Sequence, residues 1–132
     1  MPQLLDILQH KTGFIVDGIG VHSSPNSRDD DEHEVFMGIC KTELSPWHRR
    51  IDIKLYPATE FPFALLYFTG FDHFNRSMRS LAGRIGMHLT DKTLCWRVTD
   101  AMKDGQRVHC NTEEEIFKAL GMKYKEPRER DI

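Results

Sequence analysis

The sequence has few cysteines, no long apolar run and no glycine-rich nucleotide loop, and each absence excludes a class of protein. Its three cysteines lack CxxC spacing, which favours a reducing intracellular compartment over a disulfide framework. No apolar stretch approaches the roughly 18 residues of a membrane span, so we expect no membrane partner. The first residues contain neither a basic segment nor a small-residue cleavage site, so we expect no secretory signal. No Walker loop, GxGxxG or GxSxG motif occurs.

Charge is almost balanced in total but uneven along the chain. The 132 residues carry a formal net charge of −2, and 39% of them are hydrophobic, which is enough for one compact domain or two small lobes. Residues 1–47 contain three basic and eight acidic side chains, whereas residues 48–97 contain eight basic and four acidic ones. A basic middle is compatible with a surface that faces a polyanion, although a solvated surface of mixed charge is the commoner cause.

Hydrophobic periodicity predicts an α+β fold. We expect a short amphipathic helix over residues 2–11 and strands over residues 14–16, 34–40 and 48–55. Residues 22–33 are polar and predict a solvated loop. The acidic cluster in this loop lacks the glycine and glutamate positions of an EF-hand, so we interpret the loop as a surface hairpin.

The spacing of apolar residues changes from period 2 to helical near Pro57. We therefore predict helices over residues 61–68 and 72–85, with Gly86 ending the second one. Further along, the pattern predicts strands at residues 93–98 and 106–110 joined by a turn at residues 102–105, and then a helix opened by a Thr112–Glu115 capping box.

The strand predicted in HRRIDIKL places its charged residues on one face. Apolar residues alternate with Arg50, Asp52 and Lys54. A carboxylate between two cations could coordinate Mg²⁺ while the cations hold phosphate oxygens, or it could form an ordinary ion pair, which the residue types alone favour. One carboxylate cannot build a two-metal site by itself.

The longest predicted helix has an apolar face and a polar face that carries Asn75, Arg76 and Arg79. An amide and two guanidinium groups suit contacts to base edges and phosphates. Tyr67 and Phe68 precede this helix at a glycine-containing turn, where flat side chains could meet a sugar or a base. The alternative is that the aromatic residues belong to the core and the arginines are merely solvated.

Three segments of the chain carry a specific signature: HRRIDIKL (48–55), LLYFTGFDHFNRSMR (65–79) and KYKEPRERD (123–131). In this order they resemble the family X DNA polymerases of the beta and lambda types, and the similarity extends over essentially the whole chain. The resemblance implies the end of a nucleotidyltransferase palm, with a small antiparallel sheet, in residues 1–58. It implies an α/β thumb lobe in residues 59–132.

The resemblance also implies roles for individual residues. Asp52 is similar to the third metal-binding aspartate of the palm, which acts toward the primer 3′-hydroxyl, so it is the candidate catalytic residue and Mg²⁺ ligand. Lys54, on the same strand face, is a further candidate contact to DNA phosphates. The remaining candidates are nucleotide-binding residues at Tyr67, Phe68, Gly70, Asp72 and Asn75, and DNA-binding residues at Arg50, Arg76 and Arg79.

The sequence also departs from the family pattern. Phe71 stands where these polymerases usually have a small serine, and the GSxxRG phosphate-binding motif and the GDxD pair of aspartates are not found in this sequence. Because two of the three metal-binding aspartates are absent, we expect no stable Mg²⁺ binding and no polymerase activity from this chain alone.

The function implied by the resemblance is template-directed DNA synthesis in gap-filling DNA repair. Its partners would be primer–template DNA, a dNTP and the upstream palm and fingers of the same polymerase, in a nuclear monomer, with mitochondria as the alternative location. Two other functions stay open. The chain could be a non-catalytic DNA-binding module derived from a thumb, or an interaction domain without a nucleic-acid role.

Overall fold

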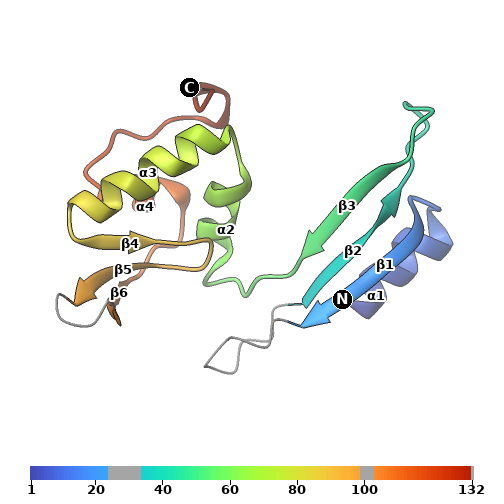
Figure 1. The fold of residues 1–132 in the computed structure, drawn as a ribbon, viewed down its shortest axis with the longest axis horizontal. Coiled ribbons are helices and arrows are strands. Elements are labelled where there is room, and N and C mark those ends of the chain that lie inside the picture. Colours follow the sequence, from blue (N-terminus) through green and yellow to red (C-terminus); the bar gives the residue numbers. More distant parts are fainter. Residues whose placement is uncertain (24–33, 99–102, 132) are drawn as a thin grey trace. The chain divides into compact units, whose positions relative to one another are not determined.

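The computed structural model describes residues 1–23, 34–98 and 103–131 (Figure 1). It divides into two compact units, Met1–Leu55 and Tyr56–Ile132. Each unit contains a three-stranded antiparallel sheet together with helical segments, so the predicted α+β class is confirmed. Among the described residues, no helix combines the length and the apolar character needed to cross a membrane.

The first unit is a small sheet with a short helix beside its first strand (Figure 1). Helix α1, Pro2–Asp6, continues into a π-helical turn at Ile7–Lys11, as predicted for residues 2–11. The strands β1 (Ile15–Ser23), β2 (Glu34–Cys40) and β3 (Arg49–Lys54) pair antiparallel in the order β1-β2-β3.

Strand β1 is longer than the sequence predicts. Asp17 and Gly18 follow the predicted strand as a turn signal, but they lie inside β1. The pairing of β1 with β2 shifts register between Ile15 and Asp17 and again between Gly18 and Gly20. The turn-forming residues therefore produce irregularities of the β-bulge type instead of ending the strand. Of the predicted loop at residues 22–33, the first two residues belong to β1 and the others lie outside the described residues.

The register between β2 and β3 separates two faces of the first sheet. Phe36 is buried and pairs with Ile53, which is half-buried. On the opposite face, Met37 pairs with Asp52, which is exposed. Because paired residues project to the same side of a sheet, β3 alternates an inward apolar row with an outward charged row, as its sequence predicts.

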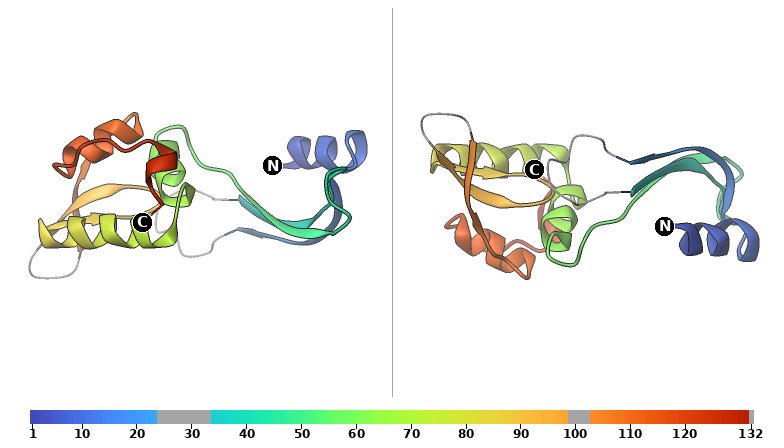
Figure 2. Two further views of the ribbon diagram at one scale, coloured as in Figure 1. Left: turned by 90° about the horizontal axis from the view of Figure 1, so that it is seen from above. Right: turned by 90° about the horizontal axis from the view of Figure 1, so that it is seen from below.

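The second unit packs helices around a second sheet. Figure 2 separates α3 from α4, which overlap in Figure 1. The strands pair antiparallel in the order β4-β5-β6. The elements in chain order are α2 (Phe61–Phe68), α3 (Asp72–Arg84), β4 (Met87–Leu89), β5 (Leu94–Val98), β6 (Lys103–Val108), α4 (Glu113–Ala119) and a 3₁₀ turn at Pro127–Glu129.

One apolar core holds the second unit together. Helix α3 contributes Phe74, Met78 and Ala82, which recur at helical spacing and are at most 5% exposed. Phe117 of α4 is fully buried and stacks with Phe74 at 6.2 Å between ring centroids. The other members of this core are Phe63, Leu66, Met87, Leu89, Leu94, Cys110, Ile116 and Leu120.

The sequence predicts most elements of the second unit but misplaces its sheet. The helices predicted for residues 61–68 and 72–85 are confirmed, and Gly86 follows α3 with φ of +80°, as its predicted stop requires. Strand β4 was not predicted. The turn predicted at residues 102–105 is wrong for residues 103–105, which belong to β6. Gly105 serves a close approach between strands, because a Cβ there would lie 2.7 Å from the backbone oxygen of Trp96.

Helix α4 begins with the predicted cap, but only one half of the capping box forms. Thr112 Oγ1 accepts a hydrogen bond from the backbone N–H of Glu115 at 3.3 Å. The Glu115 carboxylate, in turn, accepts from the backbone N–H of Asn111 at 2.7 Å and not from Thr112. Two backbone donors at the start of α4 are satisfied in this way.

Candidate nucleic-acid interface

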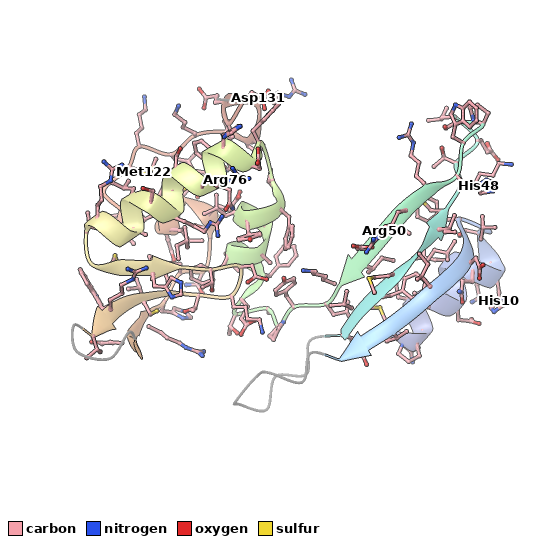
Figure 3. The ribbon with its side chains drawn as sticks, viewed as in Figure 1. His10, His48, Arg50, Arg76, Met122 and Asp131 are labelled. Atoms are coloured by element: carbon pink, nitrogen blue, oxygen red, sulfur yellow. The ribbon has the colours of Figure 1, made fainter. Side chains whose placement is uncertain are left out.

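Three predicted site residues follow one another on the exposed face of β3, where Figure 3 labels Arg50. Arg50 donates from Nε to Asp52 Oδ1 at 2.9 Å and from Nη2 to Asp52 Oδ2 at 3.3 Å. This hydrogen-bonded pair, together with the negative charge of Asp52, raises the pKa of Arg50. Lys54 is exposed on the same side of the strand. Both oxygens of Asp52 are thus engaged by a guanidinium group.

Asp52 does not form a metal site with other described residues. Two-metal catalysis requires several carboxylates that hold two ions a few ångströms apart. In the described parts of the chain, no group of three histidine, cysteine, aspartate or glutamate side chains could hold a metal ion. The residues present therefore do not fit a two-metal centre, and Asp52 would need carboxylates from outside this chain to take part in one.

The turn between α2 and α3 carries the predicted nucleotide-binding residues of the second unit. Tyr67 and Phe68 close α2, and their rings meet edge to face at 4.9 Å between centroids. Gly70 has φ of +89°, a conformation that side-chain-bearing residues rarely adopt. A Cβ at Gly70 would also lie only 2.8 Å from the Cβ of Arg130. Glycine is therefore required at this position for two independent reasons.

Helix α3 holds Tyr67 from two successive turns. Asn75 donates from Nδ2 to the backbone oxygen of Tyr67 at 3.0 Å. The Arg79 guanidinium lies over the face of the Tyr67 ring, 5.4 Å from its centroid, in a cation–π contact. Asn75 and Arg79 share one helix face because they are four residues apart. The structure thus brings three predicted site residues together.

Asp72 and Arg76 form an ion pair at the surface of α3, where Figure 3 labels Arg76. The distance between Arg76 Nη2 and Asp72 Oδ2 is 3.0 Å, and the two side chains are 65% and 62% exposed. Exposed pairs of this kind contribute little to stability. Because both side chains are largely exposed, both groups are accessible to a ligand.

Phe71, the departure from the family pattern, precedes α3 with an extended backbone and is 56% exposed. Its bulk is largely turned to solvent, so the turn accommodates it without displacing the core. The neighbouring Phe68 is also 56% exposed. Two aromatic side chains therefore stand open to solvent around Gly70.

Arg130 supports this turn from inside the molecule, and sequence reasoning missed it. The Arg130 side chain is fully buried, and its Nη1 donates to Glu113 Oε1 at 2.7 Å. Its Nε donates to the backbone oxygen of Lys125 at 3.1 Å. The guanidinium also lies 5.4 Å and 5.8 Å from the ring centroids of Phe117 and Tyr124.

The signal for Arg130 in the sequence is weak. A single arginine in the polar segment KYKEPRERD has the composition of a solvated tail, and arginine is almost never fully buried unless it is paired. Only the fold brings Glu113, two aromatic rings and the Gly70 turn around it.

The second unit combines helices and a three-stranded sheet with a turn at which Arg79 lies over the ring of Tyr67. The sequence model of the DNA polymerase beta thumb matches residues 64–131, and the chain belongs to this family. The chain is 39% identical over 134 residues to DNA polymerase lambda of Rattus norvegicus, an alignment that covers 97% of this chain and 22% of that protein.

A plant relative gives the same result. The chain is 32% identical over 108 residues to DNA polymerase lambda of Arabidopsis thaliana, an alignment that covers 78% of this chain and 20% of that protein. The resemblance to family X is therefore confirmed, with homology to DNA polymerase lambda over nearly the whole chain. The chain spans about a fifth of the length of these curated relatives.

Proposed function

We propose that this chain is the C-terminal palm and thumb portion of a family X DNA polymerase that fills gaps in DNA repair, and that it binds primer–template DNA and the incoming dNTP. The observation that carries the proposal is the assembly of Tyr67, Asn75 and Arg79 at one turn. A tyrosine ring that can pack against a sugar lies beside an amide and a guanidinium that can form hydrogen bonds, and these groups together suit a nucleotide.

The proposed nucleotide contacts are made by Asn75 and by residues at the turn between α2 and α3. Asn75 uses one N–H on Tyr67, so its second N–H and its carbonyl oxygen could contact a base edge. Tyr67, Phe68 and Gly70 would meet the sugar of the nucleotide and the primer end, and Asp72 would flank the base.

The proposed DNA contacts are cationic. Arg76 and Arg79 on α3 would face the template strand, whereas Arg50 and Lys54 on β3 would face the primer end. All four are exposed, so each can reach a phosphate at the surface.

The complete polymerase would supply the catalytic motifs that are not found in this sequence. We propose that the upstream palm and fingers of the same polymerase provide the phosphate-binding motif and the other two metal-binding aspartates, beside Asp52. The proposal places the protein in the nucleus as a monomer, with residues 1–58 as the end of the palm and residues 59–132 as the thumb.

A second candidate is a DNA-binding module without catalysis. It is favoured by Asp52, whose two oxygens are both engaged by Arg50, and which has no partner carboxylates for a metal ion among the described residues. Such a module would keep the α3 surface and lose the reaction.

Fluorescence anisotropy against a gapped DNA duplex, at several salt concentrations, tests DNA binding by the 132-residue chain. We expect a Kd on the order of 10⁻⁴ M at physiological salt, because few cations can reach phosphates. An Arg76→Ala/Arg79→Ala double variant should reduce the salt slope by about two units if both arginines neutralise phosphates. If they contact base edges instead, the affinity should fall while the slope stays nearly constant.

The matched control removes two exposed cations from another part of the second unit, Lys118 and Lys123, by substitution with alanine. This variant should bind like the wild type. Binding that is unchanged in the Arg76/Arg79 variant, or undetectable for the wild type even at low salt, would contradict the proposed interface.

A further inference from the structure

A polar cavity of about 370 Å³ lies beside the Tyr67–Arg79 pair in the second unit. Tyr67 and Arg79 form part of its lining, and His88 of β4 and Arg97 of β5 form another part. The cavity therefore connects the helix face proposed to contact DNA with the second sheet. None of the roles assigned above includes His88 or Arg97.

Two arginine side chains, Arg79 and Arg97, line the cavity. Within the described part of the chain, neither Arg79 nor Arg97 has a side-chain ion pair, and the guanidinium of Arg79 lies over the Tyr67 ring. Arg97 is exposed, while its backbone N–H is fixed by a hydrogen bond of 2.9 Å to the oxygen of Gly86. Two guanidinium groups on anchored elements suit an oxyanion, which can accept several hydrogen bonds at once.

Asp91, the one carboxylate among the described lining residues, already accepts a hydrogen bond. Tyr56 donates from its hydroxyl to Asp91 Oδ2 at 2.6 Å. Burial and the hydrogen bond to Asp91 raise the pKa of the Tyr56 phenol, so that phenol stays protonated and continues to donate at neutral pH. The two arginines therefore outweigh the single carboxylate in the charge of the cavity.

The lining selects a phosphate over a nucleobase. A base needs an open aromatic face on which to stack, but the Arg79 guanidinium lies over one face of Tyr67, the one phenylalanine, tyrosine or tryptophan ring among the described lining residues. We propose that Arg79 and Arg97 together hold a backbone phosphate of the DNA strand that runs along α3. This inference rests on the proposed function, and it extends the DNA surface from the helix to β4 and β5.

Salt-dependent anisotropy against a gapped duplex tests the site with four variants of the chain: Arg97→Ala, Arg97→Lys, Arg79→Ala and the double Arg79→Ala/Arg97→Ala. Arg97→Ala should lower the salt slope by about one unit, because the phosphate is held only when both guanidinium groups are present. Arg97→Lys keeps the charge and should keep the slope. If both arginines hold the same phosphate, the double variant should lose less slope than the two single losses added together.

Lys118→Ala is the matched control, because it removes one exposed cation from α4, outside the cavity. It should leave the slope unchanged. An Arg97→Ala slope equal to that of the wild type, while the wild type binds DNA, would overturn this site and leave the proposed function intact. A wild type that does not bind even at low salt would overturn both.

A parallel titration with a dNTP in the absence of DNA distinguishes the two sources of phosphate. We expect Arg97→Ala to bind the dNTP as the wild type does. If Arg97→Ala instead weakens dNTP binding and leaves the DNA slope unchanged, the cavity holds the phosphates of a free nucleotide, and the assignment to a DNA strand is wrong.

Discussion

Arg130 is a fully buried charge in a unit that has little room for one. Removing a guanidinium from water costs several kcal/mol, which its partners must offset. Glu113 supplies an opposite charge at 2.7 Å, Lys125 supplies a backbone oxygen, and two aromatic faces cover the group. One of its nitrogens, Nη2, is buried without a hydrogen-bond partner among the described residues. The loss of any one of these contacts should therefore lower the free energy of unfolding.

Arg130→Met should therefore destabilise the chain by about 3–5 kcal/mol, because it leaves the carboxylate of Glu113 largely buried without its partner. This is a large share of the roughly 5–15 kcal/mol that holds a typical domain together. Urea unfolding followed by circular dichroism measures the effect.

Two further variants separate charge from packing at Arg130. Arg128→Met changes an exposed arginine in the same segment and should stay within about 0.5 kcal/mol of the wild type. Adding Glu113→Gln to Arg130→Met removes the unpaired charge and should recover part of the loss. Equal stability of Arg130→Met and Arg128→Met would refute the structural role of Arg130.

At the scale of elements, the turn from α2 to α3 decides where the candidate nucleotide-binding groups lie. Tyr67 ends one helix and Asn75 belongs to the next, and the hydrogen bond between them spans the turn. Gly70 is the point at which the backbone reverses, with Arg130 directly beneath it. The position of the site thus depends on backbone geometry as much as on side-chain chemistry.

Gly70→Ala tests this dependence. We expect a loss of about 1–3 kcal/mol in the free energy of unfolding, because alanine is strained at positive φ and its Cβ would press on Arg130. The matched control is Gly83→Ala within α3, where a Cβ would meet nothing within 4 Å. That variant should gain about 0.5–1 kcal/mol, since alanine is a better helix former than glycine. If Gly70→Ala is as stable as the wild type, the turn is not strained as described.

Elements with strong periodicity could be predicted from the sequence, whereas short or irregular ones could not. Helix α3 has three core residues at helical spacing and a glycine stop, so both its type and its end are predictable. Strand β4 has only three residues, too few for alternation to be recognised. The Asp17-Gly18 pair has the composition of a turn, and only pairing with β2 shows that β1 continues through it.

The candidate site was predictable to a different extent. One sequence motif contains Tyr67, Asn75 and Arg79, and the fold brings these residues into contact. Arg97 and Arg130 belong to no motif, because their surroundings are assembled from segments far apart in the sequence. A local pattern carries no information about such neighbours.

At the scale of the whole molecule, the chain matches a limited share of its relatives. It spans about a fifth of the DNA polymerase lambda sequences that it matches. Its one candidate catalytic carboxylate, Asp52, is held by Arg50. A two-metal reaction at Asp52 would therefore need carboxylates from outside the described residues.

We accordingly expect no primer extension by the 132-residue chain at ordinary Mg²⁺ and dNTP concentrations, since a two-metal reaction needs further carboxylates beside Asp52 and the described residues form no such group. A gel assay with a labelled primer on a gapped template measures this, and a complete family X polymerase serves as the positive control. Product that forms with the wild type and disappears with Asp52→Ala would contradict the prediction.

The burial of Arg130 beneath Gly70 also has a consequence for how the protein is made. During translation Gly70 leaves the ribosome long before Arg130 does. Until Arg130 has been synthesised, the turn between α2 and α3 therefore lacks the side chain that supports it in the folded chain. Throughout that interval the core around Phe117 is incomplete and its apolar surface is open to chaperones and proteases. A premature stop codon between positions 121 and 130 would leave every candidate DNA and nucleotide contact in the polypeptide but remove the arginine beneath Gly70, so we expect the product to be destabilised.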